Sequence, residues 1–159
     1  METKQELLEI YKLHAELADR VSQRREGANR LYVSLLSVMV VFLAAFLRYR
    51  TGTISVQGIL IAAGVLGMVL SASWFFIIRS YCQLNAGKFK ALQKLEEMLV
   101  FAFFKCEWEI LERGKNKNRY WRLTGVEKIL PIGFFVASLL LILLAIVNGQ
   151  LSGLALSAA

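Results

Sequence analysis

The chain has 159 residues, of which 57% are hydrophobic, and it carries 19 lysines and arginines against 12 acidic residues. Soluble domains contain about 45–50% apolar residues, so this composition excludes a secreted disulfide scaffold, a disordered chain and a free nucleic-acid-binding domain. The length limits the chain to one domain. The excess of apolar residues lies in three uncharged blocks, which predicts an integral membrane protein.

Each of the three blocks is long enough to cross a membrane as a helix. Residues 31–47 would extend about 25 Å, residues 54–78 about 37 Å and residues 129–147 about 28 Å. Only residues 48–53 separate the first two blocks, and so short a connection forces an antiparallel transmembrane hairpin at 31–78. The third block forms a C-terminal span, with Pro131 expected in its first turn.

Lysine and arginine are concentrated in two segments of the chain. Residues 1–30 hold six of the 19 and residues 79–128 hold eleven, whereas the 48–53 loop holds two and residues 148–159 hold none. The hairpin places the two basic segments on the same side, and positive residues favour the cytoplasmic side of a membrane. We therefore expect a cytoplasmic N-terminus and, at 148–159, a short non-cytoplasmic tail.

The two cytoplasmic segments are expected to form amphipathic helices, which makes the fold class an all-α membrane protein. Between residues 5 and 21, apolar residues recur at helical spacing with charges on the other side. From residue 79 the second span continues past the membrane, Gly87 bends it, and residues 88–112 form a second helix. Its run at 98–104 is too short to cross a bilayer, and it either packs in a bundle or oligomer or lies among lipid headgroups.

Small residues at four-residue spacing in the second span permit close contact between helices. This contact is either within the hairpin or between subunits. Together with the apolar stripes of the cytoplasmic helices, they form the expected oligomer or packing interface. Its residues are Leu7, Leu17, Ala63, Gly67, Ser71, Leu92, Leu95, Leu99 and Phe103.

A turn rich in glycine, asparagine and basic residues precedes the third span. Such a cluster close to a membrane attracts anionic lipid headgroups, and it is too short to predict nucleic-acid binding. The residues expected to contact anionic lipid are Arg113, Lys115, Lys117, Arg119 and Arg122.

Residue spacing indicates no catalytic, cofactor or metal site. Cys82 and Cys106 stand 24 residues apart without a CxxC pair, and His14 is the single histidine. No phosphate-binding loop, dinucleotide-binding turn, zinc-protease helix or nucleophile elbow occurs. A lipid-modifying enzyme could use only one cluster, which we interpret as ordinary helix-surface charge. That cluster is Glu107, Glu109, Glu112 and Tyr120.

Several strings in this chain carry a family resemblance. They are YKLHAELADRVSQRREGAN at 11–29, RSYCQLNAGKFK at 79–90, EWEILERGK at 107–115 and GVEKILP at 125–131, together with Tyr120. In these the chain resembles the RipA-like small bacterial membrane proteins. The resemblance implies an octameric protein of the bacterial inner membrane with a role in stress or host adaptation and no known chemistry.

Three functions are compatible with these features. The favoured hypothesis is a non-enzymatic homo-oligomeric membrane protein that acts as a scaffold or pore, with the lipid bilayer and further copies of itself as its partners. A membrane-depolarising effector or channel of a defence system is the second, and a membrane-bound lipid-modifying enzyme the third. The thin polar content of the spans argues against a proton- or ion-coupled transporter, because coupling normally needs an ionisable group inside the membrane.

Overall fold

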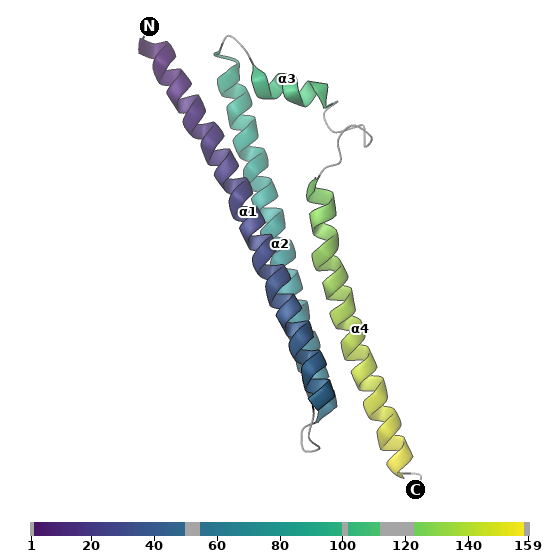
Figure 1. Cartoon of the computed structure of the whole chain (residues 1–159). Helices are drawn as coiled ribbons and strands as arrows, with labels where there is room; N and C mark the ends of the chain where they lie inside the picture. Colours follow the sequence, from purple (N-terminus) through teal and green to yellow (C-terminus); the bar gives the residue numbers. More distant parts are fainter. Residues whose placement is uncertain (1, 50–54, 100–101, 112–122, 158–159) are drawn as a thin grey trace. The chain divides into compact units, whose positions relative to one another are not determined.

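The computed structural model describes residues 2–49, 55–99, 102–111 and 123–157, and within these ranges its regular secondary structure is entirely helical. The elements, in chain order, are α1 (Glu2–Tyr49), α2 (Val56–Glu96), α3 (Phe103–Ile110) and α4 (Leu123–Ser157) (Figure 1). Three of them, α1, α2 and α4, are long and apolar enough to cross a membrane. The predicted all-α membrane fold is confirmed.

Helix α1 joins two elements that the sequence pattern treats separately. The amphipathic segment and the first apolar block form one helix of 48 residues. Gly27 lies between them, and a Cβ added there would meet nothing within 4 Å. A glycine inside a helix costs only about 1 kcal/mol, so it does not interrupt a helix that packs along its length.

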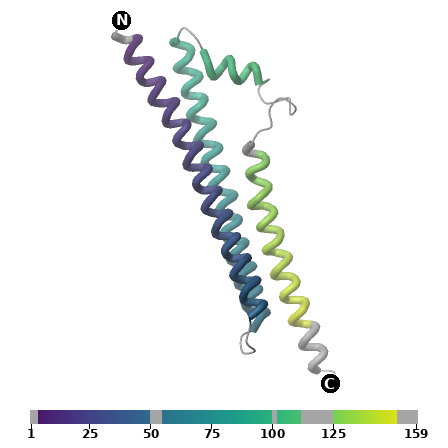
Figure 2. Tube along the Cα trace, viewed as in Figure 1, coloured from purple at the N-terminus to yellow at the C-terminus, as the bar shows by residue number. Residues whose placement is uncertain are grey.

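The chain forms two compact units. The charged unit comprises residues 1–28 and 77–127, and the apolar unit comprises residues 29–76 and 128–159. In the charged unit, α1 and α2 run side by side in opposite directions (Figure 2). Their buried side chains include Ala18, Val21, Ile78 and Leu92, and these form a narrow two-helix core.

In the apolar unit, α2 packs against both α1 and α4 through small residues. A Cβ added to Gly64 would overlap the side chain of Ile142, and one added to Gly67 would overlap the side chain of Ser138 and lie 3.1 Å from the Cε atom of Met39. These two glycines therefore allow a close approach that larger residues would prevent.

The structure corrects two expectations about helix boundaries. Helix α2 continues through Gly87 to Glu96, so no single helix spans residues 88–112. The chain turns after α2, where the N–H groups of Met98 and Leu99 bond carbonyls only three residues back, at 3.1 and 3.0 Å. The periodicity of apolar residues does not reveal this turn because the turn contains neither glycine nor proline.

The second correction concerns Pro131, which lies inside α4 and not in its first turn. Helix α4 begins at residue 123, several residues before the uncharged block. Proline lacks the N–H that would bond the carbonyl four residues earlier. Its ring is almost fully buried against the rest of the chain.

Candidate functional site

A buried polar site in the charged unit is centred on Glu96, at the end of α2. Helix α3 has Ala102 at its N-cap, without a capping side chain. The carboxylate of Glu96 takes that role, accepting hydrogen bonds from the N–H of Phe104 at 2.7 Å and of Lys105 at 3.1 Å. The Tyr11 hydroxyl donates to the same carboxylate at 2.9 Å. Glu96 is only 1% exposed, and it ties α1, α2 and α3 together.

Aromatic rings pack around this carboxylate. The ring of Phe104 lies 6.2 Å from that of Tyr11 on α1 and 5.5 Å from that of Phe89 on α2, measured between centroids. Such contacts exclude water from the hydrogen bonds beside them and strengthen those bonds electrostatically. The three helices therefore meet around the Glu96 carboxylate, which is hydrogen-bonded to Tyr11, Phe104 and Lys105.

The environment of Tyr11 makes it a poor acid or base near neutral pH. The pKa of Tyr11 is raised from 10.0 to about 12 by burial, which is the largest cause, together with the hydrogen bond to Glu96 and the negative charge of Glu96. The hydroxyl therefore stays protonated as a donor. This geometry is that of a structural joint between helices.

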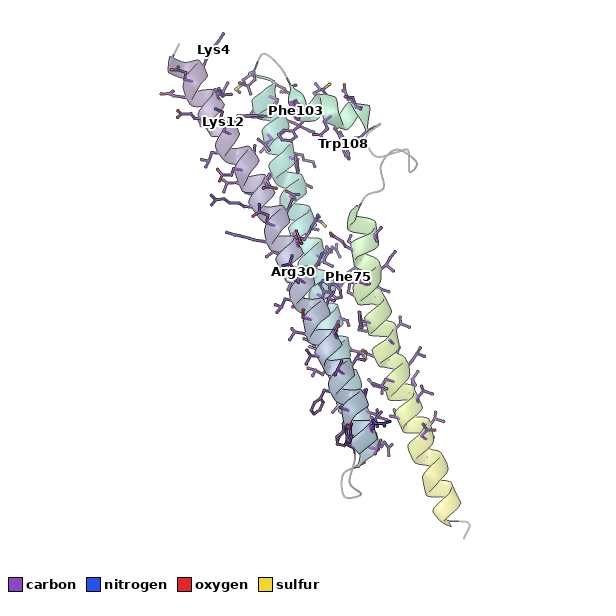
Figure 3. All side chains as sticks on the ribbon, viewed as in Figure 1. Lys4, Lys12, Arg30, Phe75, Phe103 and Trp108 are labelled. Atoms are coloured by element: carbon purple, nitrogen blue, oxygen red, sulfur yellow. The ribbon has the colours of Figure 1, made fainter. Side chains whose placement is uncertain are left out.

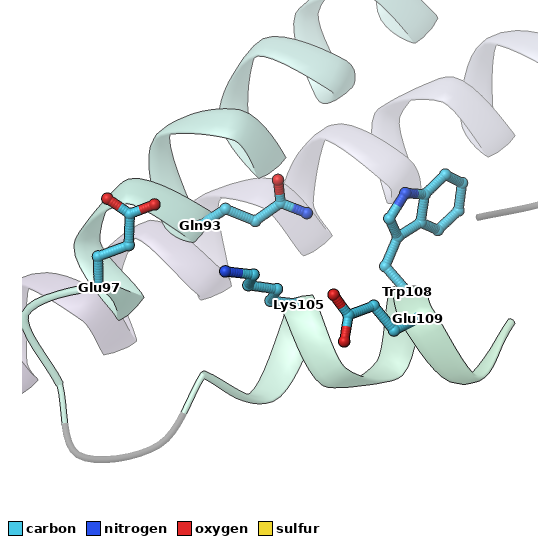
Figure 4. A pocket seen from close by; sticks show the side chains of 5 residues that line it. All are labelled: Gln93, Glu97, Lys105, Trp108 and Glu109. Atoms are coloured by element: carbon cyan, nitrogen blue, oxygen red, sulfur yellow. The ribbon is translucent and has the colours of Figure 1, made fainter. Parts of the chain in front are cut away.

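A shallow cavity of about 250 Å³ opens between the end of α2 and α3 (Figure 4). It is lined by Gln93, Glu97, Lys105, Trp108 and Glu109. The lining mixes two carboxylates, an ammonium group, an amide and an indole. Among the residues that the structure describes, no three or more His, Cys, Asp or Glu side chains converge as a metal site would require.

The glutamates of the enzyme hypothesis lie on or near α3. Glu107 and Glu109 are both exposed, and Glu109 lines the cavity. Glu112 and Tyr120 lie outside the described residues, as do the five basic residues expected to contact anionic lipid. Figure 3 places Phe103 and Trp108 on the same short helix. Two exposed carboxylates on one helix surface have the environment of ordinary surface charges.

A second polar joint in the charged unit involves Arg25 and the start of α4. Its guanidinium Nε lies 3.6 Å from Oε2 of Glu127, and both side chains are 17% exposed. Another guanidinium N–H donates to the sulfur of Cys82 at 3.9 Å. The contact with Glu127 is electrostatic, because this Oε2 accepts no hydrogen bond from the described residues. It links α1, α2 and α4.

In the apolar unit, Trp74 occupies the centre of an aromatic cluster. It is 1% exposed, and its indole N–H donates to the side-chain oxygen of Asn29 at 2.9 Å. The ring stacks on Tyr32 with 6.0 Å between centroids and meets Phe134 at 6.5 Å. This cluster joins α1, α2 and α4 through one indole whose polar atom is paired.

The residues expected at an interface fall into three classes of burial within one chain. Gly67, Ser71 and Leu92 are buried, and Phe103 is exposed. The others are half-buried, and these are Leu7, Leu17, Ala63, Leu95 and Leu99. The first three therefore contact their own chain, while a contact between copies stays a prediction for the set.

Sequence reasoning missed the joint between Tyr11 and Glu96. The pattern of the segment 5–21 groups Tyr11 with the residues of its apolar face, and no pattern in the sequence singles out Glu96. A local capping box places its acidic residue three positions from the cap, whereas Glu96 reaches N–H groups eight and nine positions later. No short sequence signal marks such a distant cap.

Comparison with known proteins identifies a family but no individual relative. The model of the octameric membrane protein family (8xMP) matches residues 8–147. No curated protein and no solved structure matches the chain. The expectation of a family of small octameric membrane proteins is confirmed.

Proposed function

This chain belongs to the octameric membrane protein family, and on that premise we propose that eight copies assemble into a non-enzymatic scaffold in the bacterial inner membrane. One observation carries the proposal. In the most apolar stretch of each candidate span, only 6% of α1, 28% of α2 and 17% of α4 is buried inside the chain. A single copy therefore covers little of its own apolar surface, and lipid and neighbouring copies are what would cover the rest.

The paired polar groups of the charged unit support a scaffold rather than an enzyme. Glu96 and Tyr11 hold three helices together through hydrogen bonds, and the glutamates Glu107 and Glu109 of α3 are exposed on the surface of that helix. We propose that this part of the molecule faces the cytoplasm, because residues 1–30 and 79–128 hold 17 of the 19 lysines and arginines. The segment 113–122 would then lie where it meets anionic headgroups.

The mass of the purified complex tests the assembly. Light scattering of the protein in lipid nanodiscs, with the lipid contribution subtracted, should give eight times the chain mass of 17.9 kDa. A monomer under these conditions would contradict the proposal. A stable smaller assembly would keep the scaffold but overturn the number of copies.

A pore is the second candidate, favoured by two exposed hydroxyl side chains. Ser34 and Ser37 lie three residues apart on α1, inside its apolar stretch, and both are exposed in the single chain. Ion flux through liposomes containing the purified assembly decides between the two functions. A scaffold predicts no flux above that of protein-free liposomes, and flux abolished by leucine at both positions would establish the pore.

A further inference from the structure

The two long helices of the charged unit carry exposed faces of opposite charge. On α1 one side carries four exposed carboxylates and three exposed cations, which leaves it acidic by one charge; the carboxylates are Glu9, Glu16, Asp19 and Glu26, and the cations are Lys12, Arg20 and Arg30. We call this side the acidic face. On α2 the exposed cations form a basic face, which consists of Arg79, Lys90 and Lys94. These two faces belong to different helices of the same unit.

Both faces turn away from the contact between α1 and α2. Successive residues of a helix are rotated by about 100°, so the residues of α1 that bond α2, such as Tyr11 and Ser22, share one side. Glu16 is rotated from these two residues by about 120–140° and Asp19 by about 60–80°, and both are exposed. The same rotation separates Lys90 from Asn85, which bonds Ser22 across the helix pair. The charges therefore remain accessible to a neighbour.

The two faces also stand at matching heights along the helix pair. Three contacts set the register of the antiparallel helices, namely Tyr11 with Glu96, Ser22 with Asn85 and Arg25 with Cys82, and in each the two residue numbers add to 107. By this register, Lys90 lies within about 3 Å of the level of both Glu16 and Asp19. Arg79 is likewise within about 3 Å of the level of Glu26.

The matching positions of the two faces along the helix pair are relevant to assembly, because a membrane restricts the symmetry by which copies can be related. Copies that share one orientation can be related only by a rotation axis along the membrane normal, since an axis in the membrane plane would invert half of them. Neighbours then stand at equal height and meet through two different faces of each copy. An acidic and a basic face at the same level are complementary under this arrangement.

We propose that the acidic face of α1 in one copy docks against the basic face of α2 in the next copy; this inference rests on the homo-oligomer proposed above. The carboxylates are already held in place, because Glu16 bonds Arg20 at 2.9 Å and Asp19 bonds Gln23 at 2.9 Å within α1. Exposed ion pairs stabilise weakly. Their role here is to select the neighbour and set its register, while the apolar unit supplies most of the contact.

Charge reversal and its rescue test the inference on the full chain in nanodiscs. Glu16→Lys with Asp19→Lys, and separately Lys90→Glu with Lys94→Glu, place like charges opposite each other at every contact between copies. This repulsion costs far more than the loss of an attractive pair, so each double variant should lose most of the wild-type assembly, and combining all four changes should restore it. The control, Glu6→Lys with Glu107→Lys, makes the same change in net charge as the first pair at exposed positions outside both faces, and it should keep the assembly.

A zero-length carbodiimide cross-link on the wild-type protein provides a measurement that does not depend on variants. The reagent couples a carboxylate to a lysine in direct contact. A mixture of isotope-labelled and unlabelled copies distinguishes cross-links between copies from those within one copy. We expect covalent dimers in which peptides containing Glu16 or Asp19 are joined to peptides containing Lys90 or Lys94. Cross-links confined to one copy, or reversals that leave the mass unchanged, would overturn the inference while the scaffold stands. A wild-type monomer would instead remove the scaffold.

A lipid could occupy the basic face instead of a neighbour. In that case Lys90→Glu with Lys94→Glu would lower the anionic lipid that co-purifies with the complex and leave its mass unchanged. This result would overturn the docking of copies at this face.

Discussion

The carboxylate of Glu96 is buried, and it accepts three hydrogen bonds from groups on two other helices. Two are backbone N–H groups of α3 and the third is the Tyr11 hydroxyl. Helix N-termini favour negative charge because their first N–H groups lack partners inside the helix. Without this side chain the short helix α3 would begin with unpaired N–H groups, since its own N-cap is an alanine.

Replacing Glu96 should loosen α3 specifically. Glu96→Ala leaves three donors unpaired in a closed site, and we expect a loss of about 2 to 4 kcal/mol; Glu96→Gln keeps one acceptor and should cost about 1 kcal/mol. Hydrogen exchange followed by mass spectrometry should show faster exchange in residues 103–110. The control is Glu97→Gln, since Glu97 is exposed. Equal exchange in all three variants would contradict the capping role.

The stabilisation that Tyr11 gives to the contact with Glu96 should depend on pH. Its pKa rises from 10.0 when unfolded to about 12 when folded, so the folded state favours the protonated hydroxyl. The resulting stabilisation is fully present below pH 10 and is lost as the pH rises through about 12. The difference in tyrosinate absorbance between the wild type and Tyr11→Phe should therefore titrate near 12.

The Glu96→Gln background provides the control for that titration. Removing the negative charge and weakening the hydrogen bond should lower the pKa of Tyr11, while burial, the largest cause of the shift, keeps part of the rise. A difference titration that is the same in both backgrounds would show that Glu96 does not act on the hydroxyl.

At the scale of elements, glycines on α2 have two different roles. Gly67 lies where α2 approaches α4 and α1, and an added Cβ there would overlap Ser138. Gly87 lies on the same helix, and an added Cβ there would meet nothing within 4 Å. The same substitution at both positions therefore separates close packing from helix propensity.

Gly67→Ala should destabilise the apolar unit, and Gly87→Ala should not. Overpacking costs about 1–3 kcal/mol, whereas alanine in place of an unconstrained helical glycine stabilises by about 0.5–1 kcal/mol. Unfolding in mixed detergent micelles, followed by tryptophan fluorescence, measures the difference. A Gly67→Ala protein that is as stable as the wild type would mean that α4 does not pack at this position.

At the scale of the whole molecule, the proposed orientation places α3 and the loop before α2 on opposite sides of the membrane. Cys106 is exposed on α3, and Ser55 is exposed just before α2. A membrane-impermeant maleimide should label Cys106 only after the cells are opened. In a Cys82→Ser, Cys106→Ser background, Ser55→Cys should be labelled from outside intact cells. The reverse pattern would invert the topology.

Much of the fold follows from the sequence alone. Uncharged blocks of sufficient length, the six-residue connection between two of them and the distribution of lysine and arginine predicted an all-α membrane protein with three spans, and the helices confirm that class. These features are predictable because the cost of placing charge in lipid depends on composition along the chain and not on distant contacts. The family match agrees with the same features.

Only the tertiary structure decided how the helices end and meet. Glu96 caps α3 and bonds Tyr11, a residue 85 positions away in sequence, and Gly87 remains helical because nothing there requires a bend. Pro131 lies inside α4 with its ring buried. Each depends on which side chains neighbouring helices bring together, and periodicity along one helix carries no information about these distant partners.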